Sequence, residues 1–112
     1  MGLPNAGRAE VDPRKLTDYC LSPTHPVGKH KSALFRAALG ITTADAGMLR
    51  EALLRAAVST EAVPGRADEF GQRYVIDFEM TSAVGAATVR SAWIVGPGED
   101  HPRLTTCYIL SE

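Results

Sequence analysis

Cysteine is scarce in this sequence, with only Cys20 and Cys107 among 112 residues. Two thiols cannot build the disulfide framework that holds small secreted scaffolds together. Cys20 falls in a helical pattern and Cys107 in a strand pattern, so we expect both to be small core residues with free thiols. Apolar residues make up 45% of the sequence, and a chain of this length buries roughly two-thirds of its unfolded surface without cross-links. We therefore expect one domain, residues 1–112.

Long apolar runs are missing as well. No stretch approaches the ~20 apolar residues that a transmembrane helix needs. Residues 1–5 also lack the charged and then apolar pattern of a secretory signal. These absences predict a protein that does not insert into a membrane and that acts in a bacterial cytoplasm, either alone or as one domain of a larger chain.

Neither sign of charge is in large excess, since the formal net charge is -1. That value argues against a protein that coats nucleic acid by bulk electrostatic attraction. The charges are nevertheless unevenly distributed. Residues 25–36 contain two histidines, two lysines and an arginine but no acid, so a local basic site is compatible with the composition.

The first half of the sequence is helical in pattern. Residues 1–11 are polar, interrupted by proline and glycine, and are expected to form an arm or a short edge strand. Asp12 before Pro13 predicts a helix start, because Asp caps free N–H groups and Pro needs no hydrogen bond at the first helical position. The loop residues 22–28 end this helix. Its inward positions, at helical spacing, are Leu16, Tyr19 and Cys20.

Two more helices are predicted before residue 59. The first spans about 29–39 and ends at Gly40, where a left-handed cap is needed. Its apolar stripe is expected to comprise Leu34 and Ala38, with Phe35 and Leu39 beside them. The second spans about 44–58, with Thr43 as its N-terminal cap. Its inward face consists of four residues at helical spacing: Leu49, Leu53, Ala56 and Ala57.

From residue 59 the periodicity changes to that of strands. Pro64-Gly65 predicts a turn, and residues 74–79 then alternate apolar and polar side chains with a period of two. Residues 88–95 predict a central strand because both of its faces are largely apolar. Residues 104–110 predict the last strand. The fold class is therefore α+β, with the helices of residues 12–58 packed on one face of an antiparallel meander of three to four strands in residues 59–112.

The densest cluster of chemically active side chains lies at the start of the second helix, at His25, Lys29, His30 and Lys31. Lys31 precedes Leu34 and Phe35 by three and four residues, so it shares their inward stripe. Its ammonium either extends into solvent along a packed stem or is held in a cleft for an anion. The free N–H groups of a helix start also favour phosphate. His25 and His30 are either inert or candidates for an acid or base.

A second cluster lies on the strands. Arg90 and Ser91 are polar residues in the middle of a strand, and Arg90 either pairs with Asp77 or Glu79 across the sheet or belongs to a site. The histidines lack the spacing of metal ligands, so we expect no metal and no other cofactor. The remaining candidates, on the last two strands, are Trp93, Thr106 and Tyr108.

Four stretches of the sequence together resemble one bacterial family of small domains of unknown function, some of which stand at the ends of toxin-like chains. They are residues 11–19 (VDPRKLTDY), 25–35 (HPVGKHKSALF), 89–95 (VRSAWIV) and 102–108 (PRLTTCY). The layout of helices followed by a meander is also similar to the ribonuclease toxins grouped around barnase, EndoU, the colicin-type ribonucleases and RelE. Toxins of that group are often basic, whereas this chain is not.

This second resemblance implies a metal-independent ribonuclease in which a ribose 2′-OH attacks the neighbouring phosphate. His30 or His25 would act as acid or base, Lys31 and Arg90 would stabilise the phosphate charge, and Thr106 would donate a hydrogen bond to it. Binding of RNA would involve His25, Lys29, Ser91, Trp93 and Tyr108, of which the two aromatic residues either stack a base or belong to the core. The implied partners are RNA and a cognate antitoxin or immunity protein. The alternative is a non-catalytic protein-interaction module with the same fold.

Overall fold

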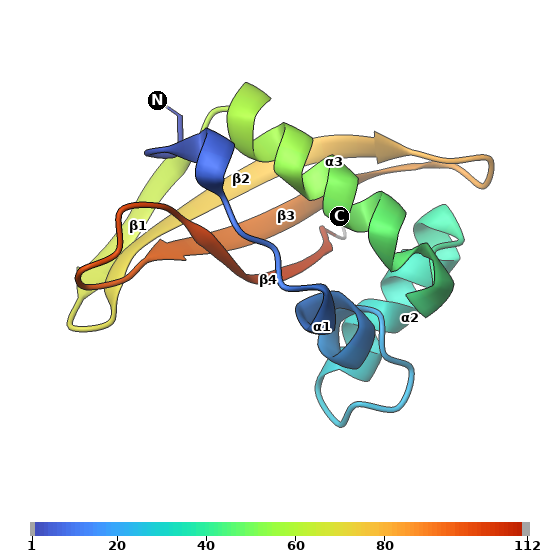
Figure 1. Ribbon diagram of the computed structural model, residues 1–112. Coiled ribbons are helices and arrows are strands. Elements are labelled where there is room, and N and C mark those ends of the chain that lie inside the picture. Colours follow the sequence, from blue (N-terminus) through green and yellow to red (C-terminus); the bar gives the residue numbers. More distant parts are fainter. Residues whose placement is uncertain (1, 111–112) are drawn as a thin grey trace.

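Helices come first and strands second, in the computed structural model of residues 2–110 (Figure 1). The helices are α1 (Pro13–Lys15), α2 (Gly28–Leu39) and α3 (Ala46–Ser59), with short turns η1 (Ala6–Arg8) before α1, η2 (Leu16–Cys20) after α1 and η3 (Thr43–Asp45) before α3. The strands are β1 (Val63–Asp68), β2 (Gly71–Thr81), β3 (Ala86–Val95) and β4 (Arg103–Ile109). All neighbouring strands are antiparallel, in the order β1-β2-β3-β4. The predicted α+β fold is confirmed.

The first helix begins as predicted and then widens. The Asp12 carboxylate accepts a hydrogen bond from the Arg14 N–H at 3.0 Å, and Pro13 occupies the first helical position. After one α-helical turn the chain continues as a π-helical turn over Leu16–Cys20. Leu16 and Cys20 are fully buried, so this wider turn is anchored by the core.

Helix α2 ends where the sequence predicted, but its buried face is rotated. Gly40 has a left-handed φ of 67° and its N–H bonds to the carbonyl of Arg36. Leu34 was expected to face inward, yet 41% of it is exposed. The face that packs inward instead contains Ser32, Phe35 and Leu39, and the Ser32 hydroxyl donates a hydrogen bond to the Leu21 carbonyl at 3.0 Å.

The N-terminal cap before α3 is Thr42 rather than the predicted Thr43. Thr42 and Asp45 form a reciprocal capping box, in which the Asp45 carboxylate accepts from the Thr42 N–H at 3.0 Å. Thr43 therefore lies inside the short turn η3. The predicted inward face of α3 is confirmed, since its four residues are buried: Leu49, Leu53, Ala56 and Ala57.

The predicted turn at Pro64-Gly65 is wrong, because both residues lie within β1. β1 is an edge strand with a register shift between Pro64 and Ala67, and proline is tolerated at such an edge because no ladder bond needs its missing N–H. The chain turns instead after Asp68, whose carboxylate accepts from the Phe70 N–H at 2.9 Å. The predicted central place of β3 is confirmed, since it pairs with both β2 and β4.

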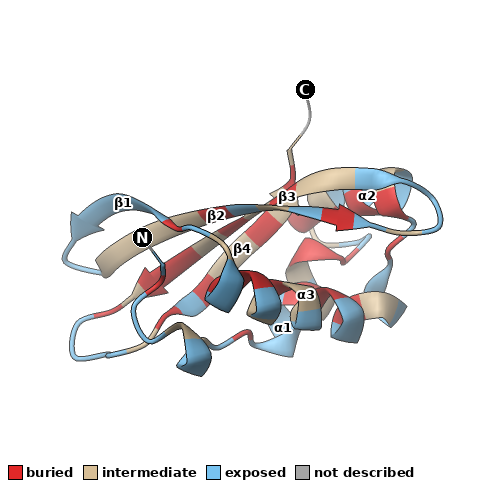
Figure 2. Cartoon of the chain, turned by 90° about the horizontal axis from the view of Figure 1, so that it is seen from above, coloured by how far each residue is buried: buried red, intermediate tan, exposed pale blue. Residues whose placement is uncertain are grey.

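The two faces of the sheet differ. In Figure 2 helices α1 and α3 form a layer below the sheet, and no helix of the described residues lies above it. The buried face carries Ile76, Val89, Trp93 and Cys107. The other face, called here the open face, carries a row of paired residues across three strands, Asp77, Arg90 and Tyr108. No helix among residues 2–110 is long and apolar enough to cross a membrane.

Candidate functional site

Lys31 lies at the centre of the candidate site, where α2 meets η2 and β4. Its Nζ donates a hydrogen bond to Tyr19 Oη at 2.6 Å. The same atom lies 4.6 Å from the centre of the Tyr19 ring and 5.7 Å from that of Tyr108. Within residues 2–110 no carboxylate forms an ion pair with it. This half-buried cation therefore has a hydroxyl and two aromatic rings around it, and its charge is available to an anion.

A glycine allows α2 to approach η2 closely enough for this contact. A Cβ atom on Gly28 would lie 2.1 Å from the Tyr19 carbonyl oxygen and 2.8 Å from its carbon. No side chain fits at that distance. The absence of a side chain at Gly28, the first residue of α2, thus places Lys31, one turn further on, against Tyr19.

His25 completes the loop that joins η2 to α2. Its Nδ1 accepts hydrogen bonds from the Val27 N–H at 3.0 Å and from the Gly28 N–H at 2.9 Å. Because Nδ1 is an acceptor, the neutral ring carries its proton on Nε2. The ring also stands edge-on to Tyr19, with centres 4.8 Å apart. His25 is therefore arranged to donate a hydrogen bond from Nε2, and in this tautomer Nε2 cannot act as a base.

Strand β4 contributes two threonines next to these groups. The register shifts between Ala92 and Trp93 of β3, and at this bulge the Thr105 hydroxyl donates to the Ala92 carbonyl at 3.1 Å. Thr106 Oγ1 lies 3.7 Å from Cys20 Sγ. Both threonines line a pocket of about 690 Å³ together with Tyr19, His25, Arg14 and Lys15, while Asp12 and Asp18 complete its wall.

We call Tyr19, His25, Lys31, Thr106 and Tyr108 the Lys31 cluster. Its members come from η2, the following loop, α2 and β4. Four of the five were predicted from the sequence as site residues: His25, Lys31, Thr106 and Tyr108. The cluster offers a cation and several neutral hydrogen-bond donors in one place, which suits an anion such as phosphate.

The two cysteines meet beneath the cluster. Both are free and buried, as their core positions predicted. The hydrogen bond between the two thiols lowers the pKa of Cys20 and raises that of Cys107. Burial opposes the lowering of the Cys20 pKa and adds to the raising of the Cys107 pKa. The Thr106 hydroxyl and the Lys31 ammonium also help to lower the pKa of Cys20. The pair was not foreseen from the sequence, because the residues lie on different elements.

Comparison with known proteins decides the family. Residues 2–111 match the family model described as a domain of unknown function, DUF6883. The chain belongs to this family. A search of curated proteins found no match.

A solved structure shares the fold of this DUF6883 domain. It is a chain of the contact-dependent growth inhibition toxin–immunity protein complex from Klebsiella pneumoniae 342. The two chains superpose with a TM-score of 0.68 and 19% sequence identity, over 89% of the DUF6883 domain and 98% of the other chain. At this identity the likeness establishes a common arrangement of helices and strands.

Arg90 lies on the open face of the DUF6883 domain and is paired. Its Nε and one terminal nitrogen each donate to the Asp77 carboxylate at 2.8 Å. These hydrogen bonds raise the pKa of Arg90 and lower that of Asp77. The cross-strand pair expected as the alternative is therefore present. Arg90 still adjoins the Lys31 cluster, because its partner on β4 is Tyr108.

The other predicted site residues lie apart from the cluster. Ser91 and Trp93 are fully buried, with the indole N–H donating to the Ser91 hydroxyl and that hydroxyl donating to the Ile76 carbonyl, both at 2.9 Å. A ligand at the surface reaches neither side chain. Lys29 and His30 are exposed on α2. No group of three or more His, Cys, Asp or Glu among residues 2–110 is arranged to hold a metal ion.

Proposed function

We propose that this DUF6883 domain is a metal-independent ribonuclease of the toxin type, and that the Lys31 cluster binds the scissile phosphate. The observation that carries the proposal is the half-buried Lys31 ammonium, which has neutral partners and no paired carboxylate among the described residues. The common fold with a chain of a toxin–immunity complex adds support. A phosphodiester is the anion that RNA presents.

The roles follow from which atoms donate hydrogen bonds. Cleavage adds negative charge to the phosphate oxygens as the 2′-oxygen attacks phosphorus, so donors placed around them favour the transition state. Lys31 supplies the charge, and the His25 Nε2–H and the Thr106 hydroxyl supply further donors. The half-buried Tyr108 ring faces the open side of the sheet, where a base can stack on it. Arg90 lies on the same face and would add positive charge near the phosphate while its guanidinium stays paired with Asp77.

Proton transfer requires two further groups. A base must take the proton of the 2′-OH as the new P–O bond forms, and an acid must protonate the 5′-oxygen as its bond to phosphorus breaks. The tautomer of His25 assigns it to the acid, since Nε2 holds a proton and Nδ1 is occupied. We assign the base to His30, which follows Lys29 on the exposed side of α2 and lies outside the cluster, so the attacking ribose has to extend past Lys31 onto the surface of the helix. The Tyr19 hydroxyl, bonded to Lys31, is the competing group that Tyr19→Phe tests.

The test uses a matched pair of lysines on α2. Purified protein should cleave single-stranded RNA in the presence of EDTA and leave 2′,3′-cyclic phosphate ends. Lys31→Met should lower the rate by roughly a hundredfold, the scale of losing one transition-state charge partner, with the circular dichroism spectrum unchanged. Lys29→Met removes an exposed charge of the same helix and should leave the rate nearly unchanged. Equal rates for the two variants would remove Lys31 from the site.

A second candidate function is a non-catalytic module that binds a cognate immunity protein or antitoxin. The Asp77–Arg90 pair favours it, because the carboxylate neutralises a charge that a nuclease would direct at phosphate. The net charge of -1 points the same way. Absence of cleavage of any RNA, together with no growth arrest on expression, would decide for this module. Cleavage that needs a divalent metal would reject the mechanism above while keeping an enzyme.

A further inference from the structure

Half of strand β2 has no strand on its outer side. β1 pairs with β2 only from Gly71 to Val75. From Asp77 to Thr81 the strand still pairs with β3, without a register shift. Within residues 2–110 no other strand borders this segment on its other side. We call residues 77–81 the free edge of β2.

The backbone of the free edge presents its hydrogen-bonding groups outward. The Leu110 N–H donates to the Thr88 carbonyl, so the peptide groups of Thr88 face β4. Peptide groups alternate along an antiparallel strand, so those of Val89 face β2 and bond to its partner Phe78. The N–H and C=O groups of the residues on either side of Phe78 then face away from β3. Three residues do so: Asp77, Glu79 and Thr81.

The two outer strands of the sheet, β1 and β4, are protected against pairing with a further strand, whereas the free edge is not. β1 carries Pro64 and a register shift, both of which obstruct pairing. β4 is covered near its start by the N-terminal arm, where the Glu10 N–H donates to the Pro102 carbonyl and the Glu10 carbonyl accepts from the Leu104 N–H, both at 2.9 Å. Proteins commonly protect exposed edges in these ways. The straight, unprotected free edge is therefore the place where the sheet can gain a strand.

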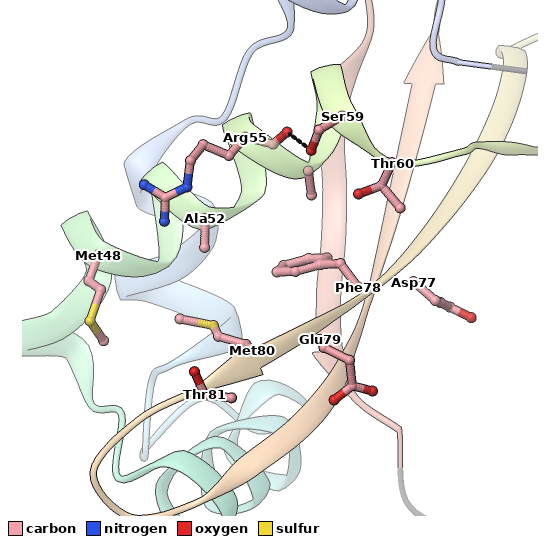
Figure 3. A pocket seen from close by; sticks show the side chains of 11 residues that line it. Met48, Ala52, Arg55, Ser59, Thr60, Asp77, Phe78, Glu79, Met80 and Thr81 are labelled. Carbon is pink, nitrogen blue, oxygen red and sulfur yellow. Dashed lines mark hydrogen bonds between the residues drawn. The ribbon is translucent and has the colours of Figure 1, made fainter.

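A groove of about 610 Å³ lies between the free edge and α3. Figure 3 shows Phe78 and Met80 on the side of β2 that faces the helix, and Met48 and Ala52 on the opposite wall. Met48 is 47% exposed. Alternate side chains of an added strand would enter this groove and cover apolar surface, while the others would lie on the open face of the sheet.

The charges on the open face select the occupant. Asp77 and Glu79 point away from the groove in Figure 3 and are exposed, but the Asp77 carboxylate is paired with Arg90, so Glu79 carries the charge that an added strand meets. A second copy paired antiparallel about Glu79 would place the two Glu79 side chains directly opposite each other. That arrangement is unfavourable, since like charges opposite each other destabilise a strand pair. Lysine or arginine of an added strand would be favourable opposite Glu79.

We propose that the free edge of β2 binds one extended segment of a partner protein, in which apolar residues alternate with basic ones. The backbone groups of Asp77, Glu79 and Thr81 supply the hydrogen bonds, and the groove and the Glu79 carboxylate select the side chains of the added segment. This site lies on β2, whereas the Lys31 cluster lies at β4, with β3 between them. An occupant of the free edge leaves the Lys31 cluster accessible, so the inference does not depend on the ribonuclease proposal.

Two synthetic peptides serve as probes, one of ten residues alternating valine with lysine and one alternating valine with glutamate. With isotope-labelled protein, the lysine peptide should shift the amide signals of residues 77, 79 and 81 and slow their hydrogen exchange. The glutamate peptide should bind roughly threefold more weakly, given one like-charge contact at Glu79 in place of an attractive one. Protection at β1 or at β4 instead, equal affinity for the two peptides, or no protection at the free edge would overturn the proposal.

Two substitutions at Glu79 distinguish the contribution of its backbone N–H to binding from that of its carboxylate. Glu79→Pro removes an N–H that the β2–β3 ladder does not use, so the strand should persist while the affinity for the lysine peptide falls at least about fivefold. Glu79→Thr keeps the N–H and should retain backbone protection, with a smaller difference between the peptides. Should Glu79→Pro unfold, the exchange map of the wild-type protein with the two peptides still decides. Unchanged affinity in a folded Glu79→Pro variant would contradict the proposed pairing.

Discussion

The contact between α2 and η2 depends on Gly28, and replacing this residue tests how the candidate site is built. In Gly28→Ala the new Cβ would stand 2.1 Å from the Tyr19 carbonyl oxygen and 3.1 Å from Cδ1 of its ring. Ordinary contacts between heavy atoms begin near 3.4 Å, so α2 has to retreat by about 1 Å. The obstacle is backbone, which cannot move aside as a flexible side chain can. The hydrogen bond from Lys31 to Tyr19 should lengthen with the helix.

The expected change in the free energy of unfolding of Gly28→Ala is the difference between two opposing effects. Overpacking of this kind costs about 1–3 kcal/mol, and alanine recovers at most about 1 kcal/mol of helix propensity relative to glycine. We expect the free energy of unfolding to fall by about 1–2 kcal/mol. Urea denaturation followed by circular dichroism measures the change, and an unaltered slope against urea would show that the unfolded state is the same.

Gly47 provides the matched control. It is also near the start of a helix, but a Cβ built there meets nothing within 4 Å. Gly47→Ala should therefore raise the free energy of unfolding by about 0.5–1 kcal/mol, since alanine restricts the unfolded chain without a steric cost. The reasoning is refuted if Gly28→Ala is as stable as Gly47→Ala.

Two further predictions concern a buried hydroxyl and a titrating histidine. Ser91→Ala leaves the Trp93 N–H without its acceptor in the core, so urea denaturation should show a loss of about 1–3 kcal/mol, whereas the exposed Ser59→Ala should change stability by at most about 0.5 kcal/mol. Hydrogen bonds to Asp100 and Glu10 raise the pKa of His101 above its usual 6.5. Their stabilisation is therefore present below the usual pKa and is lost as the pH rises through the folded-state value. His101→Gln should destabilise the protein at about pH 6 and have little effect at about pH 9, and equal losses at both would contradict this.

The fold was predictable where short-range signals agree with the tertiary structure. Asp12 caps its helix and Gly40 ends the next one, because both effects act within one helical turn. The cap at Thr42 could also have been predicted, since an acidic residue, Asp45, follows three residues later, at the spacing of a capping box. The prediction of a turn at Pro64-Gly65 failed for a different reason. Whether a proline breaks a strand depends on whether that strand is at an edge, and the edge is defined by distant residues.

The site was predictable only in part, because its contacts join separate elements. The helical spacing of Lys31 correctly indicated a half-buried lysine. Tyr19 was missed because its contact with Lys31 spans 12 residues of sequence and depends on the close approach at Gly28. The orientation of the His25 ring depends on two backbone N–H groups that donate to its Nδ1, and the sequence does not specify their direction. Trp93 shows the same limit, since alternation sorts side chains onto two faces and does not tell which face the helices cover.

The near-zero net charge argues less against an anion site than the composition suggested. Half of the twelve Lys and Arg charges are cancelled locally, because six arginines have carboxylate partners among the described residues: Arg8, Arg14, Arg66, Arg73, Arg90 and Arg103. None of the lysines, Lys15, Lys29 and Lys31, forms an ion pair among residues 2–110, and of these Lys31 is the one that is half-buried. A ligand responds to the charges near it, and distant pairs are screened by salt. The field at the Lys31 cluster is therefore set by nearby charges, namely the unpaired Lys31 ammonium and the charged side chains of the adjoining pocket wall: Asp12, Arg14, Lys15 and Asp18.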